Sequence, residues 1–312
     1  MIKVCIVGLG SHAKNKIIPA IKSIRFSELA VVTSQKDFHD VNIKTFKTIN
    51  EAMSNLEKNF FFYISTPPSL HFEIARNLIT NKFNCLIEKP IFLNSNELNE
   101  IIEIANDNST YFFECFMYKY GKIYLEFINT FLKEQNKIQS LEINFCIPKI
   151  PNKTFRSDKN IKSSLIYDMG CYPISLINQI SNKRNIKLIS VDNYGNMGEE
   201  KFYVEGNIED IDLKITFGVD KNYENYVMIN FKNGGKIKFE HFFYGRKSEK
   251  KIINTVSSKE RIRNISDGNL FKKMLEKIGN NISKTQNCRN EGMKRNIIDL
   301  ESLISDYVNL SI

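Results

Sequence analysis

The sequence predicts an α/β protein with two domains: a Rossmann domain, which is a doubly wound parallel sheet, and an α+β domain with a large, mostly antiparallel open sheet. Three observations predict this architecture. Apolar strand-like runs alternate with helix-like runs before residue 122, a glycine-rich turn joins the first strand to the first helix, and period-two patterns follow after residue 122. Alternating strands and helices give parallel sheets, whereas period-two patterns are typical of half-buried antiparallel strands.

The first part of the chain, residues 1–122, is expected to be the dinucleotide-binding domain. Its first strand is the apolar, β-branched run at residues 2–7, and an amphipathic helix follows the glycine turn. Further strands are expected at residues 29–32, 60–64, 84–88 and 110–114, with helices near 50–58, 69–81 and 95–108. This order predicts a parallel sheet with helices on both faces.

The second part, residues 123–289, is expected to bind the substrate and to form oligomers. Period-two alternation marks its strands, at residues 141–145, 211–217, 227–231 and 237–239. The sequence Asn233-Gly234-Gly235 between the last two strands predicts a β-hairpin. Helical patterns end the chain at 269–279 and 290–309, and the C-terminal helix of about 290–312 is expected to pack back near the first domain.

The predicted open sheet suggests an assembly. Its strands carry alternating Ile, Val and Phe, and an apolar face of this size must be covered by something. We therefore expect a homodimer or a homotetramer that forms through the C-terminal sheet.

Composition and charge exclude several classes of protein. The 312 residues are 42% hydrophobic and 25% charged, as in globular proteins, and no stretch approaches the roughly 18 apolar residues of a membrane span. The N-terminal apolar run is too short for a signal peptide, which predicts a cytoplasmic protein with no membrane partner. The net charge of +9 comes from dispersed lysines. We therefore expect no nucleic-acid partner and instead an anionic ligand, such as a pyrophosphate cofactor or a sugar nucleotide.

Cysteine and histidine patterns favour neither disulfides nor metal binding. The six cysteines form no C-x-x-C pair, and buried free thiols fit a reducing compartment. None of the four histidines lies at metal-ligand spacing from a cysteine or an acid, so no metal site is expected. The G-x-S-x-G turn of a serine hydrolase does not occur either.

One turn carries a signature of dinucleotide binding. Gly8-Leu9-Gly10-Ser11-His12-Ala13 matches G-x-G-x-x-G/A between a predicted strand and a predicted helix. There the missing side chains let the backbone approach a pyrophosphate at the helix N-terminus. The alternative is an ordinary glycine-rich turn. The residues expected to bind the cofactor here are Gly8, Gly10, Ser11, His12 and Ala13.

The end of the second strand bears on which cofactor is used. An Asp or Glu at this place would bond the ribose 2′-hydroxyl of NAD(H), but the chain reads Thr33-Ser34-Gln35-Lys36. With no acid to repel a 2′-phosphate, and with Ser34 and Lys36 as donors, NADP(H) is favoured. NAD(H) is the alternative if Lys36 points to solvent, because no arginine is present to grip the phosphate.

Four further segments resemble the Gfo/Idh/MocA oxidoreductase family and follow the family's order. They are Ser65-Thr66-Pro67-Pro68-Ser69-Leu70-His71, Ile87-Glu88-Lys89-Pro90, Glu114-Cys115-Phe116-Met117-Tyr118 and Asp168-Met169-Gly170-Cys171-Tyr172-Pro173-Ile174-Ser175. The last segment resembles the D-x-G-x-H/Y motif in the branch that has Tyr, similar to nucleotide-sugar ketoreductases, dihydrodiol dehydrogenase and glucose–fructose oxidoreductase. The resemblance implies that Thr66, Pro67, His71, Glu88 and Lys89 line the cofactor site.

The resemblance also implies that Lys89 and Tyr172 face the nicotinamide. Reducing a ketone by hydride leaves an oxyanion that needs a proton, and a phenol with a pKa near 10 is a feeble donor unless a neighbour assists it. A lysine ammonium close by favours the phenolate and stabilises the alkoxide. Tyr172 is thus the expected general acid/base and Lys89 its electrostatic partner. Asp168, one helical turn before Tyr172 if the segment is helical, is expected to bind a substrate hydroxyl.

Each of these roles has a simpler alternative. Lys89 could be a solvated loop residue, Tyr172 a packing aromatic, and Asp168 a helix cap or a partner for a backbone amide. His71 could instead lie on the surface of a helix. Two departures from the family pattern weaken any inference about the substrate. Lys162-Ser163-Ser164-Leu165 replaces the usual glycine-rich turn, and Tyr118-Lys119-Tyr120-Gly121-Lys122 lacks a His-Pro pair.

The leading hypothesis is an NAD(P)-dependent oxidoreductase that acts on CH–OH groups of a sugar or sugar nucleotide. One alternative is a dihydrodiol-dehydrogenase-like enzyme with a non-sugar substrate. The other is a catalytically inactive dinucleotide-binding sensor or regulatory subunit, which the altered turn before Asp168 would suit.

Overall fold

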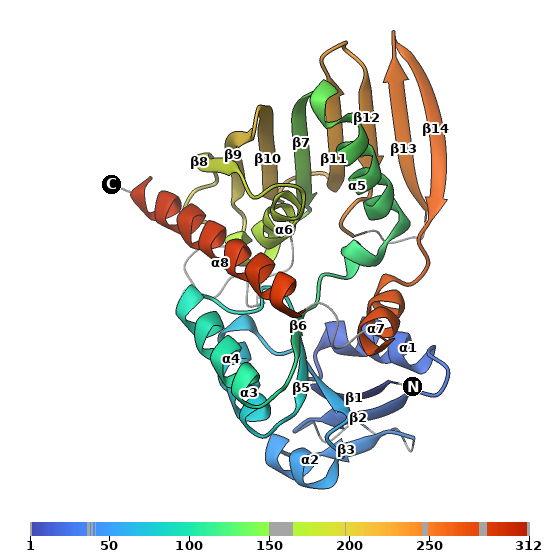
Figure 1. Ribbon diagram of the computed structural model, residues 1–312, viewed down its shortest axis with the longest axis vertical. Coiled ribbons are helices and arrows are strands. Elements are labelled where there is room, and N and C mark those ends of the chain that lie inside the picture. Colours follow the sequence, from blue (N-terminus) through green and yellow to red (C-terminus); the bar gives the residue numbers. More distant parts are fainter. Residues whose placement is uncertain are drawn as a thin grey trace. The chain divides into compact units, whose positions relative to one another are not determined.

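Two sheets organise the chain, as the sequence predicts (Figure 1). The structure is a computed structural model that describes residues 2–35, 38, 40, 42–149, 165–196, 198–244, 249–280 and 286–310. The first unit comprises Met1–Met117 and Asn269–Ile297, and the second comprises Tyr118–Gly268 and Ile298–Ile312. We expected the first division of the chain after residue 122, and it falls after Met117.

The first unit is a doubly wound Rossmann domain. Its six strands lie in the order β3-β2-β1-β4-β5-β6, and each neighbouring pair is parallel. The strands are β1 (Lys3–Val7), β2 (Glu28–Val32), β3 (Lys44–Phe46), β4 (Phe60–Ile64), β5 (Asn84–Ile87) and β6 (Phe112–Glu114). The chain reverses its winding direction between β1 and β4, so the switch point where such folds bind ligands lies at the ends of these two strands.

Helices cover this sheet, and several begin at side-chain caps. The helices are α1 (Ile18–Lys22), which continues a π-helical stretch at Ala13–Ile17, and α2 (Ile49–Asn55), α3 (His71–Thr80), α4 (Ser95–Asp107) and α7 (Leu270–Asn280). A 3₁₀ turn at Pro68–Leu70 precedes α3. The side chain of Asn94 accepts a hydrogen bond from the Glu97 backbone, which caps α4. Such a cap satisfies a backbone donor that the first helical turn leaves free.

The second unit contains an eight-stranded sheet in the order β14-β13-β12-β11-β7-β10-β9-β8. The strands are β7 (Ile138–Ile147), β8 (Arg184–Asp192), β9 (Lys201–Ile208), β10 (Ile211–Val219), β11 (Glu224–Phe231), β12 (Lys236–Glu240), β13 (Glu249–Val256) and β14 (Lys259–Ser266). Every neighbouring pair is antiparallel except β10 and β7. The β11–β12 hairpin turns at Gly234, whose φ of 83° suits glycine, so the predicted hairpin is confirmed.

The apolar face of this sheet is covered by helices of the same unit. These are α5 (Lys122–Glu134), α6 (Cys171–Ile180) and the C-terminal part of α8 (Gln286–Asn309), with 3₁₀ turns at Met117–Tyr120 and Gln135–Lys137. Phe127 of α5 packs on Phe239 of β12 with ring centroids 5.5 Å apart, and Tyr307 of α8 packs on Phe202 of β9 at 5.8 Å. The alternating Ile, Val and Phe therefore find their cover within the unit.

The opposite face of the sheet is mostly polar, although Ile262 of β14 is exposed there. Asp212 and Lys214 alternate with the buried residues of β10 and are exposed. On neighbouring strands Tyr203 donates a hydrogen bond to Asp192 over 2.6 Å, and Tyr226 donates one to Glu142. The reason given above for oligomer formation, an apolar face in need of a cover, is therefore wrong. A homodimer or homotetramer through this sheet remains a prediction without that support.

The C-terminal helix α8 contributes to both units. Its Met293 and Ile297 lie in the buried core of the first unit, together with Ile87 and Phe92. Residues from Ile298 onward belong to the second unit. Within the described residues no helix is both long and apolar enough to cross a membrane.

Candidate functional site

The carboxyl edge of the first sheet brings several predicted residues side by side. The loop after β4 continues the pairing with β1, because the Ser65 N–H donates to the Val7 carbonyl over 2.8 Å. The loop after β5 continues it with β4, because the Glu88 N–H donates to the Ile64 carbonyl over 3.0 Å. Gly8, Ser65 and Glu88 therefore follow one another across the edge where open α/β sheets bind their ligands.

The two glycines of the turn have different tasks. Gly8 has a φ of 93°, and a Cβ there would lie 2.9 Å from the Ser65 carbonyl and from a methyl of Thr66. Only glycine allows this approach without strain. A Cβ on Gly10 would meet nothing within 4 Å, so space is open in front of the helix that begins at Ser11. This cradle fits the pyrophosphate of a dinucleotide, which helix N-terminal amides attract.

The remaining turn residues divide between packing and exposure. Ala13 is fully buried against the sheet, so its small side chain serves helix packing. Ser11 is exposed and accepts a hydrogen bond from Asn15 over 2.9 Å.

His12 reaches from the glycine turn to the loop after β5. Its Nε2 lies 2.8 Å from Oε1 of Glu88, which also accepts a hydrogen bond from Tyr63. Burial raises the pKa of Glu88, but the His12 and Tyr63 contacts and the Lys89 charge lower it more, so the net pKa lies below its usual value. Glu88 is thus an anion beside Lys89. The His12 ring also packs edge-on against Phe271 of α7, at 5.3 Å.

His71 lies beneath the site surface. It is fully buried, with Nε2 3.0 Å from the Thr66 carbonyl and Nδ1 3.0 Å from the Pro90 carbonyl. Burial lowers its pKa, and a neutral ring can donate to only one of these oxygens. The ring thus lies between the loop after β4 and the loop after β5 and donates a hydrogen bond to one of them, an arrangement that the resemblance alone did not suggest.

Thr66 presents a group that a ligand could complete. Its hydroxyl oxygen is buried and has no hydrogen-bond partner among the described residues. Buried hydroxyls are normally paired, so an orphan at this edge fits the presence of a bound cofactor. Pro67 caps the 3₁₀ turn that follows.

Two residues that sequence reasoning did not assign meet near the end of β2: Gln35, which follows the strand, and Lys14 of the π-helical stretch. Gln35 donates to the Leu9 carbonyl of the glycine turn over 3.0 Å and accepts from the Lys14 ammonium over 2.7 Å. Lys14 therefore lies at the end of β2, where the adenosine ribose is expected. Ser34 is exposed at the same end, and Lys36 lies outside the described residues. Because Lys14 meets Gln35 only in the folded chain, no local pattern could have shown this contact.

In the second unit, Asp168 and Tyr172 share one continuous helical segment. A π-helical stretch at Ile166–Gly170 runs directly into α6, so the two residues are about one turn apart, as predicted. Both are nearly buried, with 3% and 7% of their surfaces exposed. A Cβ on Gly170 would lie 3.0 Å from the ring of Phe217, so glycine lets this segment approach β10.

The Tyr172 ring is surrounded by other aromatic rings. The centroid distances are 5.1 Å to Phe145, 5.7 Å to Phe243 and 6.0 Å to Tyr118. Sequence reasoning missed this group, which comes from three distant segments. Lys162-Ser163-Ser164 before the helix lies outside the described residues. Lys89 belongs to the first unit and Tyr172 to the second, so the structure describes each within its own unit.

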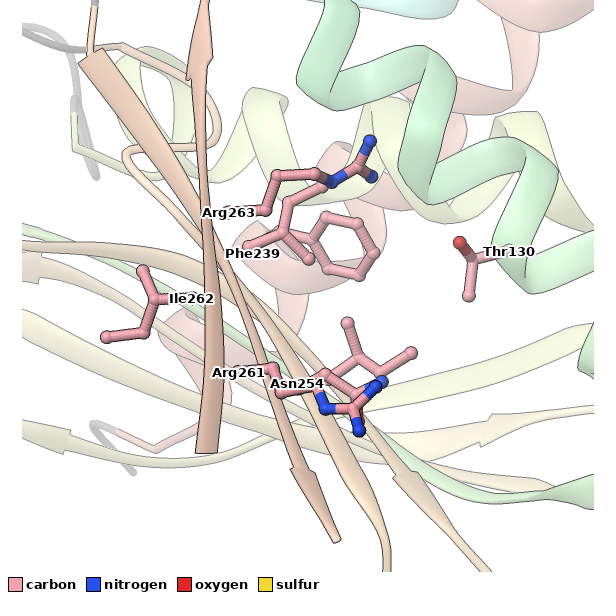
Figure 2. A pocket seen from close by; sticks show the side chains of 8 residues that line it. Thr130, Phe239, Asn254, Arg261, Ile262 and Arg263 are labelled. Carbon is pink, nitrogen blue, oxygen red and sulfur yellow. The ribbon is translucent and has the colours of Figure 1, made fainter. Parts of the chain in front are cut away.

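A hollow of about 270 Å³ lies elsewhere in the second unit, between α5 and β12–β14 (Figure 2). The guanidinium groups of Arg261 and Arg263 and the side chain of Thr130 border it. Arg263 is held by two hydrogen bonds to Glu126, of 3.1 and 2.8 Å, which fasten β14 to α5. None of the predicted site residues lines this hollow.

A glycine cradle at the switch point of a parallel Rossmann sheet, joined to a large, mostly antiparallel sheet domain, defines a dinucleotide-binding protein of the oxidoreductase type. Residues 2–116 match the Gfo/Idh/MocA family model, described as "Oxidoreductase family, NAD-binding Rossmann fold". The resemblance noted from the motifs within residues 2–116 is thereby confirmed, whereas the segment from Asp168 to Ser175 lies outside the matched residues and stays a prediction.

Curated relatives match over little more than a third of this chain. The "Uncharacterized oxidoreductase YgjR" of Escherichia coli is 27% identical over 121 residues, which are 37% of each chain. Trans-1,2-dihydrobenzene-1,2-diol dehydrogenase of Xenopus laevis is 23% identical over 124 residues, 38% of this chain and 36% of that protein. These matches span little more than a third of the relatives' length.

Solved structures match over nearly the whole chain. KijD10, a 3-ketoreductase from Actinomadura kijaniata crystallised with NADP and TDP-benzene, has a TM-score of 0.83 at 15% identity, covering 98% of this chain and 97% of that one. An aldose-aldose oxidoreductase from Caulobacter crescentus has a TM-score of 0.82 at 13% identity, covering 99% and 98%. At such identities the likeness shows the shared fold, and the predicted fold class is confirmed.

Proposed function

We propose that this chain is an NADP(H)-dependent oxidoreductase that moves a hydride between the nicotinamide and a carbonyl or hydroxyl carbon of a sugar-type substrate. The observation that carries the proposal is the carboxyl edge of the first sheet. There Gly10 leaves a cradle open, the Thr66 hydroxyl lacks a partner, and Lys89 directly follows the anionic Glu88.

Several residues would hold the cofactor. The backbone from Gly10 to His12 would bind the pyrophosphate of the cofactor. The Thr66 hydroxyl would find its missing hydrogen-bond partner in the same cofactor molecule. Ser34, Lys36 and Lys14 would bind the 2′-phosphate of NADP(H) through charge-assisted hydrogen bonds. Pro67, His71 and Glu88 would shape the nicotinamide side of the site.

The chemistry assigns a role to three further side chains. When bound, NADPH supplies the hydride that reduces a ketone, and the oxygen then needs a proton. Tyr172 donates this proton as general acid and withdraws it as general base in the opposite direction. The Lys89 ammonium stabilises the phenolate and the alkoxide, and Asp168 accepts a hydrogen bond from a substrate hydroxyl.

A sugar-type substrate is favoured by the solved neighbours. The Actinomadura kijaniata 3-ketoreductase was crystallised with TDP-benzene, and the Caulobacter crescentus enzyme acts on aldoses by its name. The Xenopus laevis relative favours a second candidate, oxidation of a non-sugar trans-diol. Both candidates use the same chemistry at a CH–OH carbon.

One assay separates these candidates. Reduction of NADP⁺ is followed by absorbance with free aldoses, TDP-linked sugars and trans-1,2-dihydrobenzene-1,2-diol. We expect turnover with a sugar of the first two groups, and a loss of about 10²–10⁴-fold in kcat for Tyr172→Phe, the usual contribution of a proton-transfer group. NADPH affinity of the variant should stay unchanged in a fluorescence titration.

Other results would redirect the proposal. Turnover of the diol alone would favour the second candidate. NADPH binding without turnover of any compound would favour the sensor hypothesis. Full activity of Tyr172→Phe would remove Tyr172 from the mechanism.

A further inference from the structure

The aromatic surroundings of Tyr172 depend on one loop. Phe145 comes from the middle of the sheet and Tyr118 from a 3₁₀ turn, so both are held by regular structure. Phe243 instead comes from the segment 241–244, which follows β12. It is fully buried and contacts Tyr172, Tyr118 and Phe145 at 5.7, 5.1 and 5.4 Å between ring centroids. The position of this loop therefore decides whether the set of rings is complete.

A buried asparagine holds the loop on one side. Asn225 on β11 is 5% exposed, and its backbone carbonyl accepts from the His241 N–H over 2.7 Å. Its side-chain Oδ1 accepts from the Phe243 N–H over 2.9 Å. Its Nδ2 donates to the Tyr244 carbonyl. Asn225 thus bonds backbone groups of three of the four loop residues, His241, Phe243 and Tyr244.

A buried ion pair holds the loop from the other side. The Lys250 ammonium donates to the Phe242 carbonyl over 3.0 Å and lies 3.2 Å from the Asp267 carboxylate. The side chains of this pair are only 2% and 1% exposed. Asp267 also accepts a hydrogen bond from the Lys122 N–H at the start of α5. The loop cannot shift without breaking buried polar contacts, which is costly in an apolar interior.

We propose that Asn225 is a positioning residue for the reaction, because it holds Phe243 against Tyr172 and so fixes the orientation of the Tyr172 ring. This inference deepens the proposed function and rests on Tyr172 as its acid/base group. An aromatic side chain packed on three rings keeps few rotamers, and a general acid works only in a narrow geometry. Asn225 does not touch substrate or cofactor in this role; it acts through Phe243.

The first test reads Tyr172 directly and needs no substrate. The protein is labelled with tyrosine that carries ¹³C at Cζ, and the Tyr172 signal is assigned as the one that Tyr172→Phe removes. We expect Asn225→Ala and Phe243→Leu to change the pH at the midpoint of the titration followed by this signal. Alternatively, the signal should split into several signals that arise from different conformations of the ring. The control is Asn230→Ala on the same strand, whose amide bonds Ser140 over 3.1 Å, and it should leave the signal unchanged.

The second test is a double-mutant cycle on kcat with the substrate found in the absorbance assay. Asn225→Ala should lower kcat by about tenfold or more with little change in KM, because misplacement of a catalytic group affects the transition state. In the Tyr172→Phe background the same substitution should change nothing further. A merely structural role would lower activity equally in both backgrounds and would overturn the inference.

The outcomes keep the two ideas apart. Full activity of Tyr172→Phe removes Tyr172 as the acid/base group of the proposed mechanism, whatever the NMR result. An unchanged Tyr172 signal in both Asn225→Ala and Phe243→Leu refutes the positioning role, whatever Tyr172 does in catalysis. If Asn225→Ala does not fold, Asn225→Asp keeps the acceptor for the Phe243 N–H, loses the amide donor, and serves in its place.

Discussion

Lys14 offers a sharp test of cofactor choice. Its ammonium lies 2.7 Å from Oε1 of Gln35, and Gln35 is in turn fixed to the Leu9 carbonyl, so the charge is held at the end of β2. A 2′-phosphate there would gain a charge-assisted hydrogen bond, whereas a 2′-hydroxyl would gain little. Lys14→Ala should therefore weaken NADPH binding and leave NADH binding nearly unchanged.

The size of the effect follows from the exposure of Lys14. Hydrogen bonds to charged groups contribute roughly 1.5–3 kcal/mol, and solvent screening of an exposed lysine places this one near the lower end. A loss of about 1–2 kcal/mol corresponds to about five- to thirtyfold in Kd. The reverse change, Ser34→Asp, adds a carboxylate that repels the phosphate and should shift preference toward NADH by about 1 kcal/mol or more.

Fluorescence titration of both cofactors at fixed ionic strength measures these changes. Lys22→Ala is the matched control, since Lys22 lies further along the same helix and pairs with Asp40 at 2.6 Å. Equal weakening of NADPH and NADH in Lys14→Ala would refute this account of the β2 end. So would a wild-type protein that binds NADH tenfold more tightly than NADPH.

Three other predictions concern the scaffold. Gly8→Ala would clash with Ser65 at 2.9 Å and strain a φ of 93°; we expect a lower Tm and no measurable NADPH binding. Burial raises the pKa of Glu200, so its contribution to stability is complete below the ordinary carboxyl pKa and falls as pH rises through the raised value. Glu200→Gln should flatten that part of the Tm-versus-pH curve, and an unchanged curve would contradict this. Asp267→Asn removes the carboxylate that lies 3.2 Å from the buried Lys250 ammonium and should cost about 3–5 kcal/mol in chemical denaturation, largely restored by adding Lys250→Met.

Local patterns were enough to predict the elements that position the cofactor site. In each of three segments, consecutive residues show the pattern that predicts the element. These segments are the run before Gly8, the five buried residues of β4 and the loop that ends in Lys89. Their parallel pairing then follows from the alternation with helices. The hairpin around Gly234 was predictable for the same reason.

The sequence patterns missed β3, β8, β9, β13 and β14, and of these β3 and β14 lack such a signal. β3 has three residues, of which only Phe46 is buried, and β14 has a single buried residue, Ile265, among exposed ones. An edge strand that buries so little shows no alternation of apolar and polar residues. β3 forms by pairing with β2, and β14 forms by pairing with β13. These partner strands are known only from the folded structure.

The missed parts of the candidate site have a similar cause. Lys14 and Gln35 are 21 residues apart, and Tyr118 and Ser175, which share a hydrogen bond of 2.7 Å next to Tyr172, are 57 apart. The motif associated His71 with the cofactor. Only the contacts in the folded structure show that a backbone carbonyl lies next to each of its ring nitrogens. Spacing along the chain carries no information about such contacts.

The polar face of the eight-stranded sheet limits what kind of assembly it could support. Lys201 and Asp220 form an ion pair of 2.5 Å there, and Lys238 lies 4.4 Å above the Tyr226 ring. Two copies meeting through such a face would trap water and depend on matched charges, in the manner of transient interfaces. Their association would weaken as added salt screens those charges, whereas an apolar contact would strengthen. Sedimentation at low and high salt would therefore show whether self-association of this protein uses a charged or an apolar surface.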